Sequence, residues 1–189
     1  PDFKNLANSI ADAAIAAFPA DIEALKAVKL NDGYTVEEEI SAQTGKTGEK
    51  HVLAFYAALE APYVAEYVHN NSKLGAIVAF NKEVPTEIGR NVAMQIASMN
   101  PVSVSRNDVP KEIVEKEFEI ARDKAREEGK PEAMLDKIAE GRLNKFYKES
   151  CLLEQEFIMD PALTIEKYLK GVDADLTVTA FKRVNLNVD

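Results

Sequence analysis

The chain has 189 residues, of which 46% are hydrophobic and 29% charged, and its formal net charge at pH 7 is −9. This length allows one or two small domains with a real core, while the negative charge argues against general nucleic-acid binding, which needs a dense basic surface. No apolar run approaches the roughly 20 residues that span a bilayer, which argues against a membrane protein.

Cys151 is the single cysteine of the chain. It cannot form an internal disulfide, which fits a reducing, cytoplasmic setting, and the sequence shows no signal peptide. The chain opens Pro-Asp-Phe, without an initiator methionine and inside a stretch of helical pattern. We therefore expect a fragment whose N-terminal part has been cut away.

Three helices are predicted in the first 50 residues. Residues 3–18 are alanine-rich and repeat apolar side chains at helical spacing, and Pro19 ends this pattern. Asp21 stands in the N-cap position of a short second helix, DIEALKAV. A third helix begins at Val36 with VEEEIS and is expected to end near Gly45–Gly48.

A three-stranded antiparallel meander is predicted next. From residue 51 onward, three segments rich in Val, Ile, Tyr and Phe follow one another: HVLAFYAALE, YVAEYVH and LGAIVAFNK. Pro62 and a polar turn at residues 70–73 separate them, as expected for hairpin connections. Residues 85–101, PTEIGRNVAMQIASMNP, then predict an amphipathic helix between two prolines.

Residues 110–149 predict a helical hairpin. This stretch is densely charged, with both signs interspersed. Its apolar residues alternate in steps of four and three through Val114, Phe118, Ala121 and Ala125. EEGKPE interrupts the pattern, which resumes at Met134. Such a pattern is typical of two helices that fold back on each other as an antiparallel coiled coil.

The last segments, EQEFIMDP, TIEKYLKG and DLTVTAFKRV, predict a strand, a short helix and a strand. The predicted fold class is α+β, with antiparallel three-stranded sheets packed against helices in two half-core subdomains and an inserted antiparallel coiled-coil hairpin. We expect the N-terminal half of the core at residues 1–104, the hairpin at 105–150 as a dimerisation-type arm, and the C-terminal half of the core at 151–189.

Few residues carry recognisable chemistry. The two histidines, His51 and His69, form no plausible zinc ligand set with Cys151. A Cys–His nucleophile would need Cys151 to lie beside a histidine and the pKa of the Cys151 thiol to be lowered. The residues around Cys151, KESCLLEQ, show no such context. The carboxylates are spread through the charged hairpin, where pairing with Lys and Arg on the helix surface explains them.

One stretch, QTGKTGEKH at residues 43–51, resembles the end of a phosphate-binding loop. The first glycine of that motif is missing near Ala42, and no buried strand precedes it, so we interpret the stretch as a solvated loop. In contrast, the polar hairpin tip within HNNSKLGAIVAF and the charged two-helix arm suit a protein that acts by contacting another protein.

Longer stretches of the sequence resemble the bacterial elongation factor Ts family. They are YVHNNSKLGAIVAF at residues 67–80, NVAMQIASMNP at 91–101, and the run from Val109 to Pro161 with its GKPEAMLDKIAEGRLNKF and LLEQEFIMDP segments. The resemblance extends from end to end of the chain. It implies a guanine-nucleotide exchange factor that binds elongation factor Tu–GDP and displaces the phosphate- and Mg²⁺-binding elements of that GTPase, so that GDP leaves and GTP rebinds. It implies neither bond-making chemistry nor a cofactor.

The resemblance also implies which residues contact the GTPase. Leu74 and Gly75 match the Ile/Leu-Gly pair at the family's hairpin tip, which reaches the GTPase near its phosphate-binding side. Met94, Gln95 and Ile96 match the Ala-Met-His-Ile/Val stretch on a helix that packs against the partner. Gln95 replaces the family's usual histidine, and a glutamine hydrogen-bonds without titrating near neutral pH.

A third match lies in the second half of the chain, where Phe157, Ile158 and Met159 correspond to a Phe-x-Met strand turned towards another domain of the GTPase. Two family parts are missing from the sequence, an N-terminal ubiquitin-associated-like domain and a Thr-Asp-Phe-Val motif. Phe3 aligns with the helix that follows this motif, and a C-terminal helical extension found in some members is also missing. We therefore expect weaker binding and poorer exchange than in a full-length factor.

Two other classes of function stay open at this point. One is a structural interaction module without exchange activity, whose coiled-coil arm serves self-association into a homodimer. The other is a small hydrolase using His69 or Cys151, which would need one of them in a pocket with a partner residue. The resemblance implies no direct nucleic-acid partner and no membrane partner.

Overall fold

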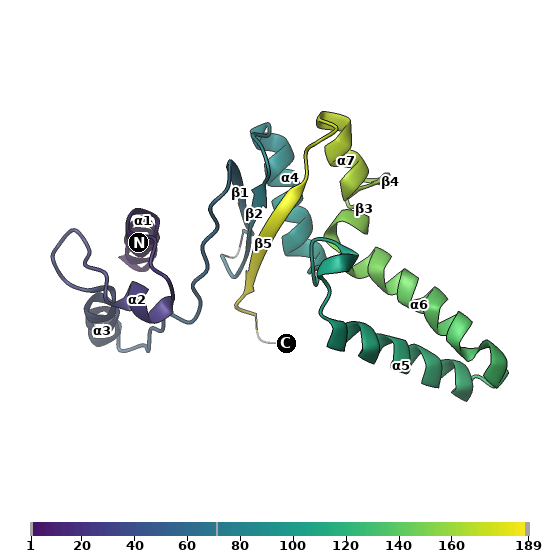
Figure 1. Cartoon of the computed structure of the whole chain (residues 1–189). Helices are drawn as coiled ribbons and strands as arrows, with labels where there is room; N and C mark the ends of the chain where they lie inside the picture. Colours follow the sequence, from purple (N-terminus) through teal and green to yellow (C-terminus); the bar gives the residue numbers. More distant parts are fainter. Residues whose placement is uncertain (1, 71, 188–189) are drawn as a thin grey trace. The chain divides into compact units, whose positions relative to one another are not determined.

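The computed structural model describes residues 2–70 and 72–187. The chain divides into two compact units, Pro1–Ala58 and Leu59–Asp189, whose elements are labelled in Figure 1. The boundaries predicted at residues 104 and 150 both fall inside the second unit. The division into two half-cores and an arm stays a prediction.

The described part of the first unit contains the three predicted helices, α1 (Asp2–Ala17), α2 (Ile22–Lys26) and α3 (Val36–Thr47). Local caps set their ends. The Asp21 carboxylate accepts a hydrogen bond from the Ala24 N–H at 2.8 Å, and Thr35 and Glu38 form a reciprocal capping box at the start of α3. Gly48 ends α3 in the left-handed conformation, as glycine does at many helix C-termini.

Two expectations for residues 43–60 are wrong. Residues 43–47 are the last turn of α3 rather than a solvated loop, because the helical hydrogen bonds continue through Gly45 as far as Gly48. Residues 51–60 form no strand. A composition rich in Val, Phe and Tyr suits a strand, but it cannot make one without a neighbouring strand that takes up its backbone hydrogen bonds.

A three-stranded antiparallel sheet forms the centre of the second unit. Its order is β1 (Tyr63–Val68), β2 (Leu74–Phe80) and β5 (Val178–Asn185), with β2 in the middle. The third strand therefore comes from the C-terminal end of the chain and not from the segment that precedes β1. The small and apolar side chains of β2 suit a central strand with neighbours on both edges.

The elements between β2 and β5 include the four predicted helices in the predicted order, but two strands stand in place of the single strand predicted at EQEFIMDP, and three short 3-10 helices were not predicted. In chain order, these elements are α4 (Thr86–Met99), the short 3-10 helix η1 (Arg106–Asp108), α5 (Lys111–Glu127), η2 (Glu132–Met134), α6 (Leu135–Ser150), η3 (Leu152–Glu154), β3 (Glu156–Phe157), β4 (Asp160–Thr164) and α7 (Ile165–Val172). β3 and β4 form a separate two-stranded antiparallel sheet. The fold class is therefore α+β, as predicted.

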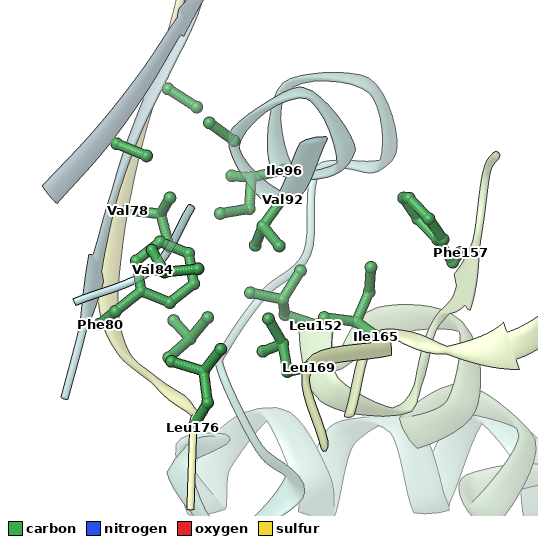
Figure 2. Packing of buried hydrophobic residues seen from close by; sticks show 14 of the residues in the cluster. Val78, Phe80, Val84, Val92, Ile96, Leu152, Phe157, Ile165, Leu169 and Leu176 are labelled. Carbon is green, nitrogen blue, oxygen red and sulfur yellow. The ribbon is translucent and has the colours of Figure 1, made fainter. Parts of the chain in front are cut away.

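The core of the second unit lies between β2, α4 and the segments after the helical hairpin. Figure 2 shows Phe80 and Ile96 facing Leu152 and Leu169 across this core, and all four are buried. Helix α4 approaches β1 so closely that a Cβ atom at Gly89 would lie 2.9 Å from the Cβ of Ala65. Glycine is therefore required at residue 89 by the packing itself.

Helices α5 and α6 pack side by side (Figure 1). Small or apolar residues are buried along their contact: Ala121, Ala125, Leu135 and Ala139. At the base, the Arg106 guanidinium donates to both carboxylate oxygens of Glu154 at 2.7 and 2.6 Å and lies over the ring of Tyr147. The helical pair is thus confirmed, while its coiled-coil geometry stays a prediction.

Candidate interaction site

The connection between β1 and β2 is a tight turn held by backbone hydrogen bonds. The His69 N–H donates to the Leu74 carbonyl and the Ser72 N–H donates to the His69 carbonyl, both at 2.8 Å. Ser72 adopts a positive φ of 56°, a strained conformation for a residue with a side chain. Asn71, part of the predicted turn at 70–73, lies outside the described residues. The polar residues here act as turn formers.

Each group considered for catalysis has its own set of neighbours. The Nδ1 of His69 is 3.0 Å from the hydroxyl of Tyr67, and the ring of His51 packs 5.5 Å from that of Phe3. Cys151 is buried with its Sγ 3.5 Å from the Ser103 Oγ, and burial raises the pKa of its thiol. A buried thiol with a raised pKa is a poor nucleophile, so the hydrolase hypothesis finds no support.

Metal-binding clusters, cavities and membrane-spanning helices were also considered among the described residues. Among residues 2–70 and 72–187, no group of three or more His, Cys, Asp and Glu side chains is placed to hold a metal ion. A cavity of about 780 Å³ in the first unit is lined by α1, α3 and residues 28–32, and contains neither histidine nor Cys151. Within the same described ranges, no helix is both long and apolar enough to cross a bilayer.

Leu74 and Gly75 begin β2 directly after the turn, and both are half-buried. Ala76, Val78 and Phe80 point into the core, so Gly75 faces the opposite side of the sheet because successive residues alternate. Gly75 pairs with Val68 of β1 and with Val184 of β5. The three residues form one row across the sheet, which we call the tip row.

The tip row presents bare backbone between two aliphatic side chains. Val68 is 60% exposed and Val184 is half-buried. The residues that the family resemblance singles out include neither Val68 nor Val184. The alternation in YVAEYV, which places Val64 and Val68 on the same face, carries the signal for Val68. Val184 has no local signal, because its place beside Gly75 depends on a strand pairing between distant segments.

The three candidates on α4 differ in accessibility. Met94 is half-buried, whereas Gln95 and Ile96 have no exposed surface. Ile96 belongs to the core of the second unit. Met94 is therefore the one of the three that a partner reaches without rearrangement of the helix.

The third group of candidates lies at the end of β3. Phe157 is buried, with its ring stacked on Tyr168 at a centroid distance of 4.2 Å. Ile158 and Met159 follow it and are 38% and 59% exposed. The structure thus anchors this segment through Phe157 and leaves the next two side chains open to contact.

The fold and these sites define an α+β protein with a packed helical pair. It has a hairpin on which the exposed Val68 lies beside Gly75, and a second turn with the exposed apolar side chains Ile158 and Met159. The chain belongs to the elongation factor Ts family, whose model, described as elongation factor TS, matches residues 1–188. Membership places it among the translation elongation factors.

Curated relatives named elongation factor Ts match it along almost its whole length. The one from Azobacteroides pseudotrichonymphae is 49% identical over 189 residues, which are 100% of this chain and 69% of that protein. The one from Cytophaga hutchinsonii is 48% identical, over 98% of this chain and 68% of its own length. The one from Porphyromonas gingivalis is 44% identical, over 100% and 69%.

Proposed function

We propose that the protein binds elongation factor Tu in its GDP-bound form and promotes release of GDP, so that GTP can rebind. It acts in the cytoplasm, makes and breaks no covalent bond, and requires no cofactor. Family membership supports this proposal, and the geometry of Gly75 at the hairpin tip is the observation that carries it for this chain.

Gly75 is a glycine that its own fold does not require. It does not adopt a positive φ, and a Cβ atom there would lie 3.4 Å from the Tyr67 carbonyl oxygen and 3.8 Å from Val68 Cγ2, both ordinary contacts. A glycine inside a strand costs about 0.5–1 kcal/mol relative to alanine. Such a glycine commonly marks a place where another backbone or a ligand approaches closely.

The tip row suits contact with an apolar part of the GTPase. A partner group that lies against the bare backbone of Gly75 meets Val68 on one side and Val184 on the other. Leu74 precedes Gly75 on the core-facing side of the sheet, where its half-buried side chain packs against the core and supports the row. Because the side chains of the tip row are apolar and offer no charge or hydrogen-bond donor to a phosphate, we assign the row to displacement of a partner segment rather than to capture of the nucleotide.

Release of GDP then follows from linkage. Elongation factor Tu is a P-loop GTPase, in which backbone amides, a lysine and Mg²⁺ hold the phosphates. If the exchange factor binds the nucleotide-free conformation better than the GDP-bound one, GDP and the factor weaken each other's binding by the same factor. A small shift of the phosphate-binding elements is enough to weaken GDP binding, because their contacts with the phosphates are short and charge-assisted.

Two further contacts belong to the same proposal. Ile158 and Met159 provide exposed apolar side chains for a second region of the GTPase. Met94 contributes from α4, while Gln95, Ile96 and Phe157 support the surface from within. Contacts at separate places would fix the orientation of the hairpin tip on its target.

The test is release of a fluorescent GDP analogue from elongation factor Tu. Addition of the chain is expected to raise the release rate, and Leu74→Ala is expected to reduce that gain about tenfold, which corresponds to about 1.4 kcal/mol of lost contact. Gly75→Ala is expected to act similarly, because its methyl group occupies the place of the approaching partner. An unchanged release rate with the parent chain would refute the proposal.

Two matched controls separate contact from folding. Gly171→Ala places a methyl group in open space on α7. Val64→Ala shortens a valine on the same strand and face as Val68 but at the other end of β1. Both are expected to leave the release rate unchanged, and a loss equal to that of Gly75→Ala in either control would show that the tip has no special role.

A second candidate function, self-association through the helical pair, rests on α5. Ile113 and Ile120 are seven residues apart and each is 37% exposed, the spacing of a helix face that packs against another helix. We propose that this face mediates a homodimer. Sedimentation equilibrium of the parent chain and of Ile113→Lys/Ile120→Lys tests this, since a monomer in both would exclude it.

A further inference from the structure

Gln95 lies on α4 with no solvent-exposed surface. Its neighbours on the same helix, Val92 and Ile96, are part of the apolar core. A primary amide carries two N–H donors and an oxygen acceptor, and it costs free energy when it is buried without partners. The contacts of this amide therefore explain why a polar residue stands here.

The amide of Gln95 binds the backbone on both sides of Phe157. Its Nε2 donates to the Glu156 carbonyl oxygen at 3.0 Å, and its Oε1 accepts from the Ile158 N–H at 3.0 Å. The Nε2 also lies 3.3 Å from the Oε1 of Gln155, another fully enclosed side chain. All these partners belong to the same chain.

The side-chain amide of Gln95 makes the hydrogen bonds that a neighbouring parallel β-strand would make. In a parallel ladder, one residue donates to the carbonyl of residue i−1 and accepts from the N–H of residue i+1 on its neighbour. Gln95 makes the same two bonds to Glu156 and Ile158, with its side-chain amide in place of a peptide unit. Strand β3 is two residues long and pairs with β4 alone among the described strands, so this amide supplies its second neighbour.

We infer that Gln95 is a positioning residue that fixes the backbone of residues 156–158 on α4 and thereby presents Ile158 and Met159 to the partner. Phe157 secures the same segment through its stack on Tyr168. The part of this inference that concerns the partner rests on the proposed function. The part that concerns the backbone rests on the hydrogen bonds alone.

The first test measures amide hydrogen exchange by NMR. Gln95→Met keeps an unbranched side chain of similar length but removes the amide, leaving the Ile158 N–H and the Glu156 carbonyl without these partners. Exchange of the Ile158 amide is expected to speed up by about tenfold or more relative to amides of β2, because a lost buried hydrogen bond opens the segment locally. Gln95→His, which keeps one donor and one acceptor, is expected to restore part of the protection.

Asn91→Leu is the matched control. Asn91 lies one turn earlier on α4, and its Nδ2 donates to the hydroxyl of Tyr168 at 3.1 Å. Its loss leaves the hydrogen bonds of Gln95 to Glu156 and Ile158 in place, so the control separates these bonds from the support given through the ring of Tyr168. This variant is expected to leave the ratio of Ile158 to β2 exchange unchanged. Equal ratios in Gln95→Met and in the parent chain would overturn the positioning role. If Gln95→Met does not fold, Gln95→Asn, whose amide is one methylene shorter, is measured in the same way.

The second test titrates elongation factor Tu against the same variants by calorimetry. Gln95→Met is expected to raise the dissociation constant about tenfold, with Asn91→Leu near the parent value. A faster Ile158 amide with an unchanged dissociation constant would overturn the link to partner binding. Failure of the parent chain to bind would refute the proposed function, whereas the exchange ratios would still decide whether Gln95 positions the segment.

Discussion

The two compact units differ in what holds them together. Among the described residues of the first unit, Leu25 and Val36 are the buried apolar side chains, and α1 buries none of its 16 residues. The second unit contains a contiguous cluster of buried residues drawn from β2, α4, η3, α7 and β5. Elements far apart in sequence therefore meet around a large apolar core in the second unit, whereas the first unit buries few apolar side chains.

Different interactions stabilise the two units. In the first unit the helix ends are fixed by Asp21, the Thr35 capping box and Gly48, and the Tyr56 hydroxyl donates to the Pro19 carbonyl at 2.8 Å. Such bonds contribute about 1 kcal/mol each. In the second unit, each buried aliphatic side chain contributes more, because it leaves water completely.

The largest effect is expected in the core of the second unit. Leu169→Ala removes a fully buried side chain and should lower the free energy of unfolding of this unit by about 2–5 kcal/mol, since a cavity remains. Denaturant unfolding measures it. Val172→Ala, on the exposed end of the same helix, should change the free energy by about 0.5 kcal/mol or less. Equal losses in both variants would contradict the core assigned here.

A smaller, local effect is expected in the first unit. Thr35→Ala removes the capping box of α3 and should cost about 1 kcal/mol. Hydrogen exchange should show α3 amides losing protection while β2 amides keep theirs. Ser9→Ala is the control, since that hydroxyl accepts no helix-end N–H and donates to the Asn5 carbonyl within α1. Parallel loss of protection in α3 and β2 would show that the two units unfold together.

The smallest effect is a pH dependence at the base of the helical pair. The hydrogen bonds from Arg106 lower the pKa of Glu154. The unfolded chain therefore binds a proton more readily, so this contribution is present above the unfolded pKa of about 4.3 and disappears as the pH falls through the folded pKa. The pair is partly exposed and should contribute about 1 kcal/mol or less.

Thermal unfolding of the parent chain and of Glu154→Gln between pH 7 and pH 3 measures this dependence. The parent should be the more stable at pH 7, and the two curves should converge towards pH 3. Glu149→Gln is the matched control, because its carboxylate lies 3.6 Å from Lys145 on an exposed helix face. A difference between parent and Glu154→Gln that is constant down to pH 3 would contradict the assigned cause.

In the candidate site, some features follow from short stretches of sequence, and others depend on contacts between distant segments. The turn before Leu74 and the outward face of β1 follow from short patterns, and the family resemblance singles out Gly75. The place of Val184 beside Gly75, and the enclosure of Gln95, depend on strands and helices whose residues lie far away in the chain. No local pattern distinguishes a glutamine on the surface of a helix from one that binds a buried backbone.

The positions of the helices and the pairing of α5 with α6 follow from the sequence, because caps, prolines, glycines and apolar spacing act over a few residues. The last turn of α3 was the exception. Tertiary structure decided which segment becomes the third strand. Residues 51–60 and residues 178–185 both have strand-like composition, but the latter pair with β2. It also decided that Gln95 binds the Glu156–Ile158 backbone. Both outcomes depend on which backbone groups find partners at long range, and a short stretch of sequence does not contain that information.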